Sequence, residues 1–358
     1  MSFLKRDAWL PILLVILFAL IAASFFVPRT PVPVDVPTSS PSSSSASSSV
    51  AIPDERAVTY IPLASPASNA NAEFSGLAWY GDYLILLPQY PNRFGAGDGA
   101  LFAILKADIL AFLDGKSKDA LKPRTIPFKA NGLSRIGGFE GYESIGFSGD
   151  QIFLTIESKP NAMVGNLVKG KIAPDLSGIE IDATTRLQIP PQADITNHSD
   201  ETMIVTKDQV LTVYESNGTA VNPKPVAHVF DFKPVSLGTI PFPNIEYRIT
   251  DATPVDDANK FWAINYFFPG DTKLLAINEA IAVKFGKGKT HAQYPQVERL
   301  VEFKYNSNGI ALTDTPPIQF VLLNADARNW EGIARLDNRG FLMVTDSFPQ
   351  TILGYVAK

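Results

Sequence analysis

The chain has 358 residues, 46% of them hydrophobic, which is enough to build one large all-β domain or two average domains. A net charge of −5 argues against a nucleic-acid-binding protein, because such proteins need a basic face to neutralise phosphates. Cysteine is absent, which excludes disulfides, cysteine metal sites, a cysteine nucleophile and a lipid carried on an N-terminal cysteine.

The N-terminus carries an uncharged apolar run over residues 8–27. A helix of about 20 such residues covers the roughly 30 Å of a bilayer core. Lys5 and Arg6 precede the run, so the positive-inside tendency puts residues 1–7 in the cytoplasm and predicts a transmembrane signal anchor. A signal peptide cleaved near the small residues 22–24 is the alternative. Either way, the rest of the chain is predicted to lie outside the cytoplasm, in a periplasm or at the cell surface.

Residues 28–56 alternate Pro with Val and Thr and then become nearly pure Ser. Pro-rich segments are extended and Ser-rich segments stay solvated, and neither can form a packed core. This stretch is therefore predicted to be a disordered linker, and residues 57–358 are predicted to form the folded domain.

A degenerate β-hairpin recurs within the predicted domain. Each copy starts with a polar, mostly acidic residue and a small residue, and a Gly-, Asp- or Asn-containing turn then leads to a second apolar run. Two apolar runs around such a turn predict a β-hairpin. The five copies begin at Ser75, Glu143, Glu201, Asp251 and Glu331.

This repeat predicts an all-β fold, a β-propeller with five blades, because each interval can hold a blade of roughly 40–50 residues. The interval between the last two copies is long enough for a sixth blade, although residues 273–296 within it read as an insertion with a helical part. Only residues 352–357 remain as a strand after the last copy. The strand missing from that blade is predicted at residues 58–63, where it would close the ring without a free sheet edge. A β-sandwich with similar hairpins is the alternative.

Residues equidistant from the turn of a regular hairpin face each other across the two strands. The pairs predicted in this way are Glu143 with Glu157, Glu201 with Glu215, Glu331 with Asp346, Ser75 with Gln89, and Asp251 with Asn265. Directly opposed carboxylates destabilise a hairpin and need a positive partner. Basic side chains lie three residues before three of the copies, at His198, Arg248 and Arg328. Rotation about the propeller axis would bring all of these side chains to one mouth of the channel.

Two interpretations of this mouth stay open. Arg248 and Arg328 can neutralise the acids in salt bridges between blades, with His198 an ordinary surface histidine. Alternatively, the mouth binds Ca²⁺, which takes six to eight oxygen ligands. The ligands would be Glu143, Glu201, Asp251, Asn265 and Glu331. Such an ion could polarise an ester or phosphoryl oxygen of a small anionic substrate and activate water; His198, Arg248 and Arg328 are then the candidate catalytic residues.

Four segments carry a family resemblance: residues 74–77, 139–145, 329–333 and 340–346. They resemble the propeller family named for an esterase-like activity of phytase and, more loosely, the lactonase and strictosidine-synthase-like propellers. The resemblance implies a propeller with a polar channel and metal-dependent hydrolysis of an ester, lactone or phosphoester. A non-catalytic propeller that binds a ligand or protein at the cell surface is the alternative. Nucleotide binding is not expected, since Val283 stands where a phosphate-binding loop ending at Thr290 requires glycine.

Overall fold

The computed structural model describes residues 52–276 and 279–358. The predicted anchor at residues 8–27 and nearly all of the predicted linker lie outside this range. Among the helices of the described part, none is long and apolar enough to cross a membrane.

The strands of the described residues pair in chain order into five groups, called blades 1 to 5 here. Blade 1 contains β3 (Phe74–Tyr80), β4 (Tyr83–Pro88), β5 (Ala100–Leu105) and β6 (Arg124–Lys129). Blade 2 contains β7 (Phe139–Ser148), β8 (Gln151–Ser158), β9 (Val164–Ile172) and β10 (Ile179–Ile189). Blade 3 contains β11 (Asp200–Val205), β12 (Gln209–Tyr214), β13 (Val226–Asp231) and β14 (Ser236–Pro241).

Each of the remaining two blades also pairs with one of the two N-terminal strands. Blade 4 contains β15 (Arg248–Ala252), β16 (Lys260–Phe267) and β17 (Val297–Asn306), and β17 pairs with both β18 (Gly309–Leu312) and β19 (Ile318–Phe320). Blade 5 contains β20 (Trp330–Leu336), β21 (Gly340–Thr345), β22 (Leu353–Ala357) and the N-terminal β2 (Thr59–Ile61).

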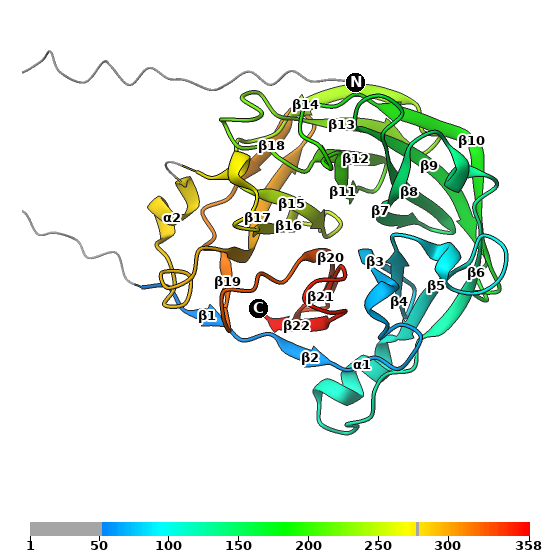
Figure 1. Cartoon of the computed structure of the whole chain (residues 1–358), viewed down its shortest axis with the longest axis horizontal. Coiled ribbons are helices and arrows are strands. Elements are labelled where there is room, and N and C mark those ends of the chain that lie inside the picture. The colour runs from blue at the N-terminus through cyan, green and yellow to red at the C-terminus, as the bar shows by residue number, and fades with distance from the viewer. Residues whose placement is uncertain (1–51, 277–278) are drawn as a thin grey trace, which may run out of the picture. The chain divides into compact units, whose positions relative to one another are not determined.

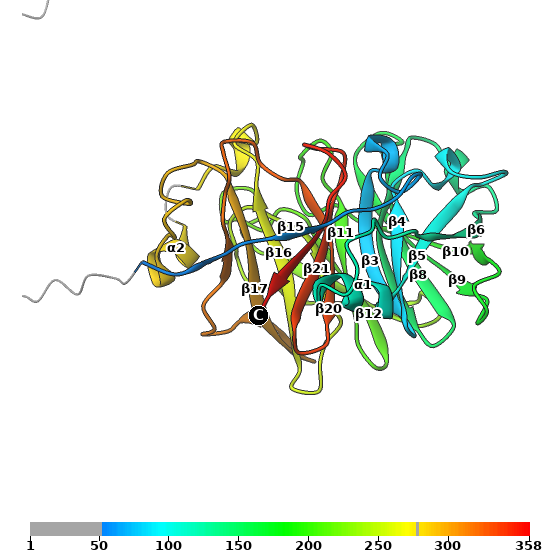
Figure 2. The same cartoon turned by 90° about the horizontal axis from the view of Figure 1, so that it is seen from below.

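The first strand of each blade contacts the first strand of the next, from β3 through β7, β11, β15 and β20 and back to β3. The sheets are therefore arranged around one axis, as Figure 1 shows down that direction and Figure 2 shows from the side. This is the arrangement of a β-propeller. The alternative β-sandwich would instead pack two sheets face to face.

The N-terminal strands complete two blades. β2 pairs antiparallel with β22, with Tyr60 opposite Gly354, so the closing strand lies where the sequence predicts it. β1 (Glu55–Arg56) pairs in parallel with β19. The sequence places these two residues in the linker, whereas the folded part already includes them.

Helices lie only between strands in the described residues. α1 (Lys106–Leu113) connects β5 to β6, and α2 (Ala280–Phe285) lies within the predicted insertion in blade 4. Short 3-10 helices cover Ala70–Ala72, Pro91–Arg93, Leu133–Arg135 and Thr272–Leu274. The outer strands β6 and β10 also pair in parallel, which joins blades 1 and 2 along their outer edges.

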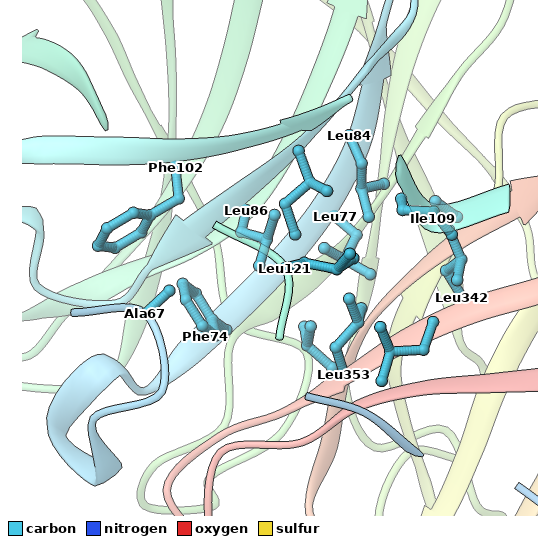
Figure 3. Close-up of a cluster of buried hydrophobic side chains, with 14 of the residues drawn as sticks. Ala67, Phe74, Leu77, Leu84, Leu86, Phe102, Ile109, Leu121, Leu342 and Leu353 are labelled. Atoms are coloured by element: carbon cyan, nitrogen blue, oxygen red, sulfur yellow. The ribbon is translucent and has the colours of Figure 1, made fainter. Parts of the chain in front are cut away.

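The core lies between the blades, with a cluster of buried apolar side chains at each of the five interfaces. Figure 3 shows the cluster at the seam, where Leu77 and Leu84 of blade 1 lie near Leu342 and Leu353 of blade 5. Because each blade is covered on both faces, its inner strands read as nearly continuous apolar runs, for example residues 84–87. Removing one such buried leucine side chain costs about 2–5 kcal/mol.

Candidate functional site

A β-bulge interrupts the first strand of every blade near its start. In blade 1 the register passes from Phe74 opposite Pro88 to Gly76 opposite Leu87, which leaves Ser75 as the extra residue. The same step leaves Glu143, Glu201 and Glu331 as the extra residues in blades 2, 3 and 5. Bulges re-aim side chains and are frequent beside functional sites.

The bulges overturn the pairing predicted from equal distances to the turn. Glu157 lies opposite Gly141 rather than Glu143. One residue of this difference arises because the turn is centred between Gly149 and Asp150 rather than on Asp150, and the other because the bulge adds one residue to one strand. The predicted carboxylate pairs are therefore not cross-strand neighbours. Each bulged side chain can instead turn toward the axis of the ring.

Blade 4 has its bulge in the same place. Ile249 pairs with Asn265 and Ala252 with Ala263, so Thr250 and Asp251 together face the single residue Ile264, and one of them is the extra residue. Asp251 therefore lies at the bulge of its strand, as the repeat predicts, but its side chain is engaged by another blade.

Asp251 and Asn265 are buried with partners of their own. Asp251 Oδ2 accepts the backbone N–H of Ile333 at 2.8 Å, so it links blade 4 to blade 5. Asn265 Nδ2 donates to the carbonyls of Glu246 and Arg248 at 2.9 and 3.1 Å. Its Oδ1 accepts from Arg299 Nε at 2.8 Å. Neither side chain lines the pocket described next.

The bulged carboxylates surround a small cavity of about 70 Å³. Its lining comes from the starts of the first strands, the ends of the second strands and the adjoining loops, all at one mouth of the ring. Water needs roughly 10–15 Å³ of such volume, so the cavity has room for a few waters or one hydrated ion. The lining consists of Ser75, Gln89, Glu143, Glu157, Asn197, Glu201, Arg248, Asn329, Glu331 and Asp346.

The structure thus brings Glu143, Glu201, Glu331 and Arg248 together, as the sequence predicts for the acidic mouth. Glu157 and Asp346 were expected only as facing partners of other acids, and Asn197 and Asn329 were not expected at all. Their common signal is position: Glu157 and Asp346 lie at or just beyond the end of a second strand, and Asn197 and Asn329 lie three residues and one residue before the start of a first strand.

Two carboxylate oxygens of the pocket lack a hydrogen-bond partner in the described part of the chain. They are Oε2 of Glu157, a residue only 2% exposed, and Oδ1 of Asp346. Glu143 Oε1 accepts from Gln89 Nε2 at 3.1 Å. An unpartnered buried carboxylate oxygen is costly, so these atoms indicate room for a cation, a proton or an ordered water.

Arg248, the basic residue of the lining, already has two acidic partners. Its Nη1 lies 2.7 Å from Glu215 Oε1, and its Nε lies 2.7 Å from Asp271 Oδ2. His198 Nδ1 lies 2.7 Å from the other carboxylate oxygen of Glu215. Glu215, fully buried, is therefore held between a guanidinium and an imidazole, and His198 is a buried residue behind the pocket rather than a surface histidine.

Arg328 lies away from the pocket. Its Nε donates to Glu298 Oε2 at 2.7 Å and its Nη2 donates to the carbonyl of Val321 at 2.9 Å. Glu298 Oε2 also accepts from the indole of Trp330 at 2.7 Å, which links blade 4 to blade 5. Arg328 thus forms the kind of inter-blade salt bridge that the first interpretation of the mouth describes.

Burial and mutual repulsion keep much of the pocket protonated. Burial, with repulsion from Asp346 and Glu215, raises the pKa of Glu143 to about 7. Burial, with repulsion from Glu143 and Glu215, raises the pKa of Glu157 to about 9. Burial likewise holds the pKa values of Glu201 and Glu331 well above their usual range. An added cation would favour ionisation of all four.

Glu215 shows the opposite shift. Burial by itself would raise its pKa, but the charges of Arg248 and His198 outweigh burial and lower it to about 2. The strongly acidic group of the cluster is therefore the one that has basic partners. The acids that face the cavity have no basic partner of their own among the residues that the structure describes.

As the side chains stand, no group of three or more His, Asp or Glu residues in the described ranges could hold a metal ion. The chemistry of the donors nevertheless fits a hard cation, because Ca²⁺ binds carboxylate, amide and water oxygens. A bound ion would require the carboxylates to turn inward from bulges and strand ends.

No family model matches this chain, so the family resemblance rests on its short motifs. No curated protein matches it either. Among solved structures, a glucose dehydrogenase is 10% identical with a TM-score of 0.44, covering 84% of this chain and 99% of that one. An exo-β-1,3-galactanase from Clostridium thermocellum is 7% identical with a TM-score of 0.44, covering 83% and 61%. The soluble aldose sugar dehydrogenase from Escherichia coli is 11% identical with a TM-score of 0.41, covering 84% and 99%. Similarities this distant carry no argument about function.

Proposed function

We propose that this protein is a five-bladed β-propeller, anchored through residues 8–27 and held outside the cytoplasm, that binds Ca²⁺ at its channel mouth and hydrolyses an ester or phosphoester there. The observation that carries this proposal is the lining of the cavity. Five carboxylates face about 70 Å³, two of them with unpartnered oxygens, and the guanidinium beside them is already engaged.

The ligands would come from the bulges of the first strands and from the ends of the second strands. Glu201 and Glu331 stand on bulges, while Glu157 and Asp346 stand at the ends of the second strands. This set replaces the Asp251 and Asn265 of the sequence prediction, since those side chains are engaged elsewhere. When bound, Ca²⁺ would polarise the scissile carbonyl or phosphoryl group and make water more acidic.

Glu143 is the residue best suited to move a proton. Burial raises its pKa to about 7 in the absence of a cation, and a bound cation would lower that pKa, so Glu143 would be ionised and able to accept a proton at neutral pH. It would take a proton from water as the water oxygen attacks the ester carbon, and it would return that proton to the departing alcohol oxygen as the carbon–oxygen bond breaks. Gln89 orients Glu143 through the 3.1 Å hydrogen bond. Arg248 and His198 hold Glu215 ionised behind the site.

A second candidate function is a non-catalytic binding propeller in which Ca²⁺ only rigidifies the mouth. The small volume of the cavity favours this alternative, because an ion and a few waters fill about 70 Å³. Calcium binding without turnover would then be the outcome.

Calorimetric titration of the full-length chain with Ca²⁺ tests the shared part of both proposals. We expect binding, and a stabilisation of about 2.7 kcal/mol when the free ion reaches about 100 times its Kd. Glu201→Gln and Glu331→Gln should each weaken binding at least about tenfold by removing a charged ligand. Glu180→Gln is the control, because Glu180 is exposed on β10 and pairs only with Lys129 and Asn131.

Unchanged melting in Ca²⁺ and in EDTA, together with no heat of binding, would exclude the cation site. Glu331→Gln would then raise the stability of the protein, since it would remove one of several uncompensated acids. Binding of Ca²⁺ without hydrolysis of any ester in its presence would leave the non-catalytic alternative.

A further inference from the structure

Resting on the proposed hydrolase, we infer that the cavity admits the carbonyl end of an uncharged carboxylic ester, in place of its waters, and rejects phosphoesters and other anionic esters. The sequence predicts a small anionic substrate, whereas the charges around the cavity favour a neutral one.

The lining offers no uncommitted positive charge among the described residues. Arg248 is bound by Glu215 and Asp271, and His198 lies behind the lining against the same Glu215. Phosphate sites are built from Arg or Lys forks and from helix N-termini. The other lining residues are acids, three amides and Ser75.

The acidic lining also opposes an anion directly. Glu157 is buried, lines the cavity and keeps one oxygen without a partner, so it marks a place for positive charge. Two ionised carboxylates are enough to offset the charge of one divalent cation, so a cation bound by the lining acids would leave no positive charge for an anion. A phosphomonoester would add nearly two further negative charges to the same volume, where like charges at short range repel strongly.

A neutral ester needs much less positive charge from this site than an anionic ester does. Its carbonyl oxygen gains one negative charge only during the reaction, which a single cation with one amide N–H can stabilise. Asn197, Gln89 and Asn329 place side-chain amides in the lining. The reaction consumes one water and yields a carboxylic acid and an alcohol, and the acid product is itself repelled from the acidic mouth once it ionises.

Two matched comparisons test this inference on the Ca²⁺-loaded full-length protein. p-Nitrophenyl acetate and mono-p-nitrophenyl succinate share a leaving group and differ by one remote negative charge, and p-nitrophenyl phosphate tests the phosphoester. We expect kcat/KM for the acetate to exceed that for each anion by about tenfold or more. Glu331→Gln should narrow the ratio between acetate and succinate, whereas Glu180→Gln, on the exposed face of β10, should leave it unchanged.

A preference for the succinate or the phosphate would overturn the inference while leaving the proposed hydrolase in place. Absence of turnover with all three esters would instead count against the hydrolase. In that case calorimetric titration with phenyl phosphate and phenyl acetate decides the inference. Binding of phenyl phosphate at the Ca²⁺-loaded pocket would overturn it, and binding of phenyl acetate alone would support it.

Discussion

At the scale of single residues, the channel mouth shows how partners rather than residue type set the charge of a carboxyl group. Glu215 is the most completely buried of the acids, yet its pKa falls to about 2 because Arg248 and His198 contact it. Burial raises the pKa of Glu143 to about 7 and that of Glu157 to about 9 because neither has a basic partner. The same chemical group therefore stabilises the fold in one place and strains it in another.

These shifts predict how stability depends on pH in the absence of divalent cations. Glu143 and Glu157 bind protons more tightly in the folded state than in the unfolded state. The free energy of unfolding therefore falls as pH rises from their usual pKa of 4.5 toward about 7 for Glu143 and about 9 for Glu157. Glu215 acts in the other direction, and its contribution is lost as pH falls from 4.5 toward about 2. Chemical unfolding in EDTA should show stability highest near pH 5 and falling toward pH 9, by up to about 1.4 kcal/mol per pH unit for each of Glu143 and Glu157 that is still protonated in the folded state.

Glu143→Gln should flatten the part of this decline up to pH 7, and saturating Ca²⁺ should remove most of it. A stability that rises between pH 5 and pH 8 without divalent cations would contradict this assignment of the buried acids.

At the scale of the strands, the recurring bulge explains what the sequence could and could not predict. The hairpins, their turns and the closing strand follow from apolar runs and turn residues, which are local signals; Gly81 and Gly149, for example, supply the positive φ that their turns need. The bulges have no such local signal, and in blade 2, for example, the equidistant pairing was counted from one residue of the turn rather than from its centre. The pairing therefore failed, and Asp251 was expected to line the mouth although its side chain accepts a hydrogen bond from Ile333 of the next blade. Arg328 and Arg248 occupy the same position in their copies of the repeat, but Arg328 pairs with Glu298, away from the cavity.

Close approach of the first strands at the seam predicts the effect of a small substitution. A Cβ added at Gly332 would lie 2.9 Å from the backbone of Gly76 and Leu77 and 2.8 Å from Val344 Cγ2. Gly332→Ala should therefore destabilise the protein by about 1–3 kcal/mol, the range typical of overpacking. Gly178→Ala is the control, because its nearest contact would be an ordinary 3.7 Å. Equal urea midpoints for the two variants would show that blades 5 and 1 can separate at no cost.

At the scale of the whole ring, the seam between blades 5 and 1 differs from the other four interfaces because it joins the two ends of the described chain. The apolar cluster there buries Ile61 of β2 together with Leu353 of β22. Closure therefore depends on a strand that precedes the first hairpin by more than ten residues.

This dependence predicts the outcome of two truncations. A chain starting at residue 64 lacks β1 and β2, so the edge of β22 and part of the seam cluster lose their cover. We expect it to melt at a lower temperature than a chain starting at residue 52 and to associate through the exposed edge, since unpaired strand edges recruit other chains. Thermal unfolding followed by circular dichroism measures the first effect, and light scattering measures the second. Equal melting temperatures and a monomeric state for both chains would show that the four remaining interfaces hold the ring together. The N-terminal strand would then not be needed to close it.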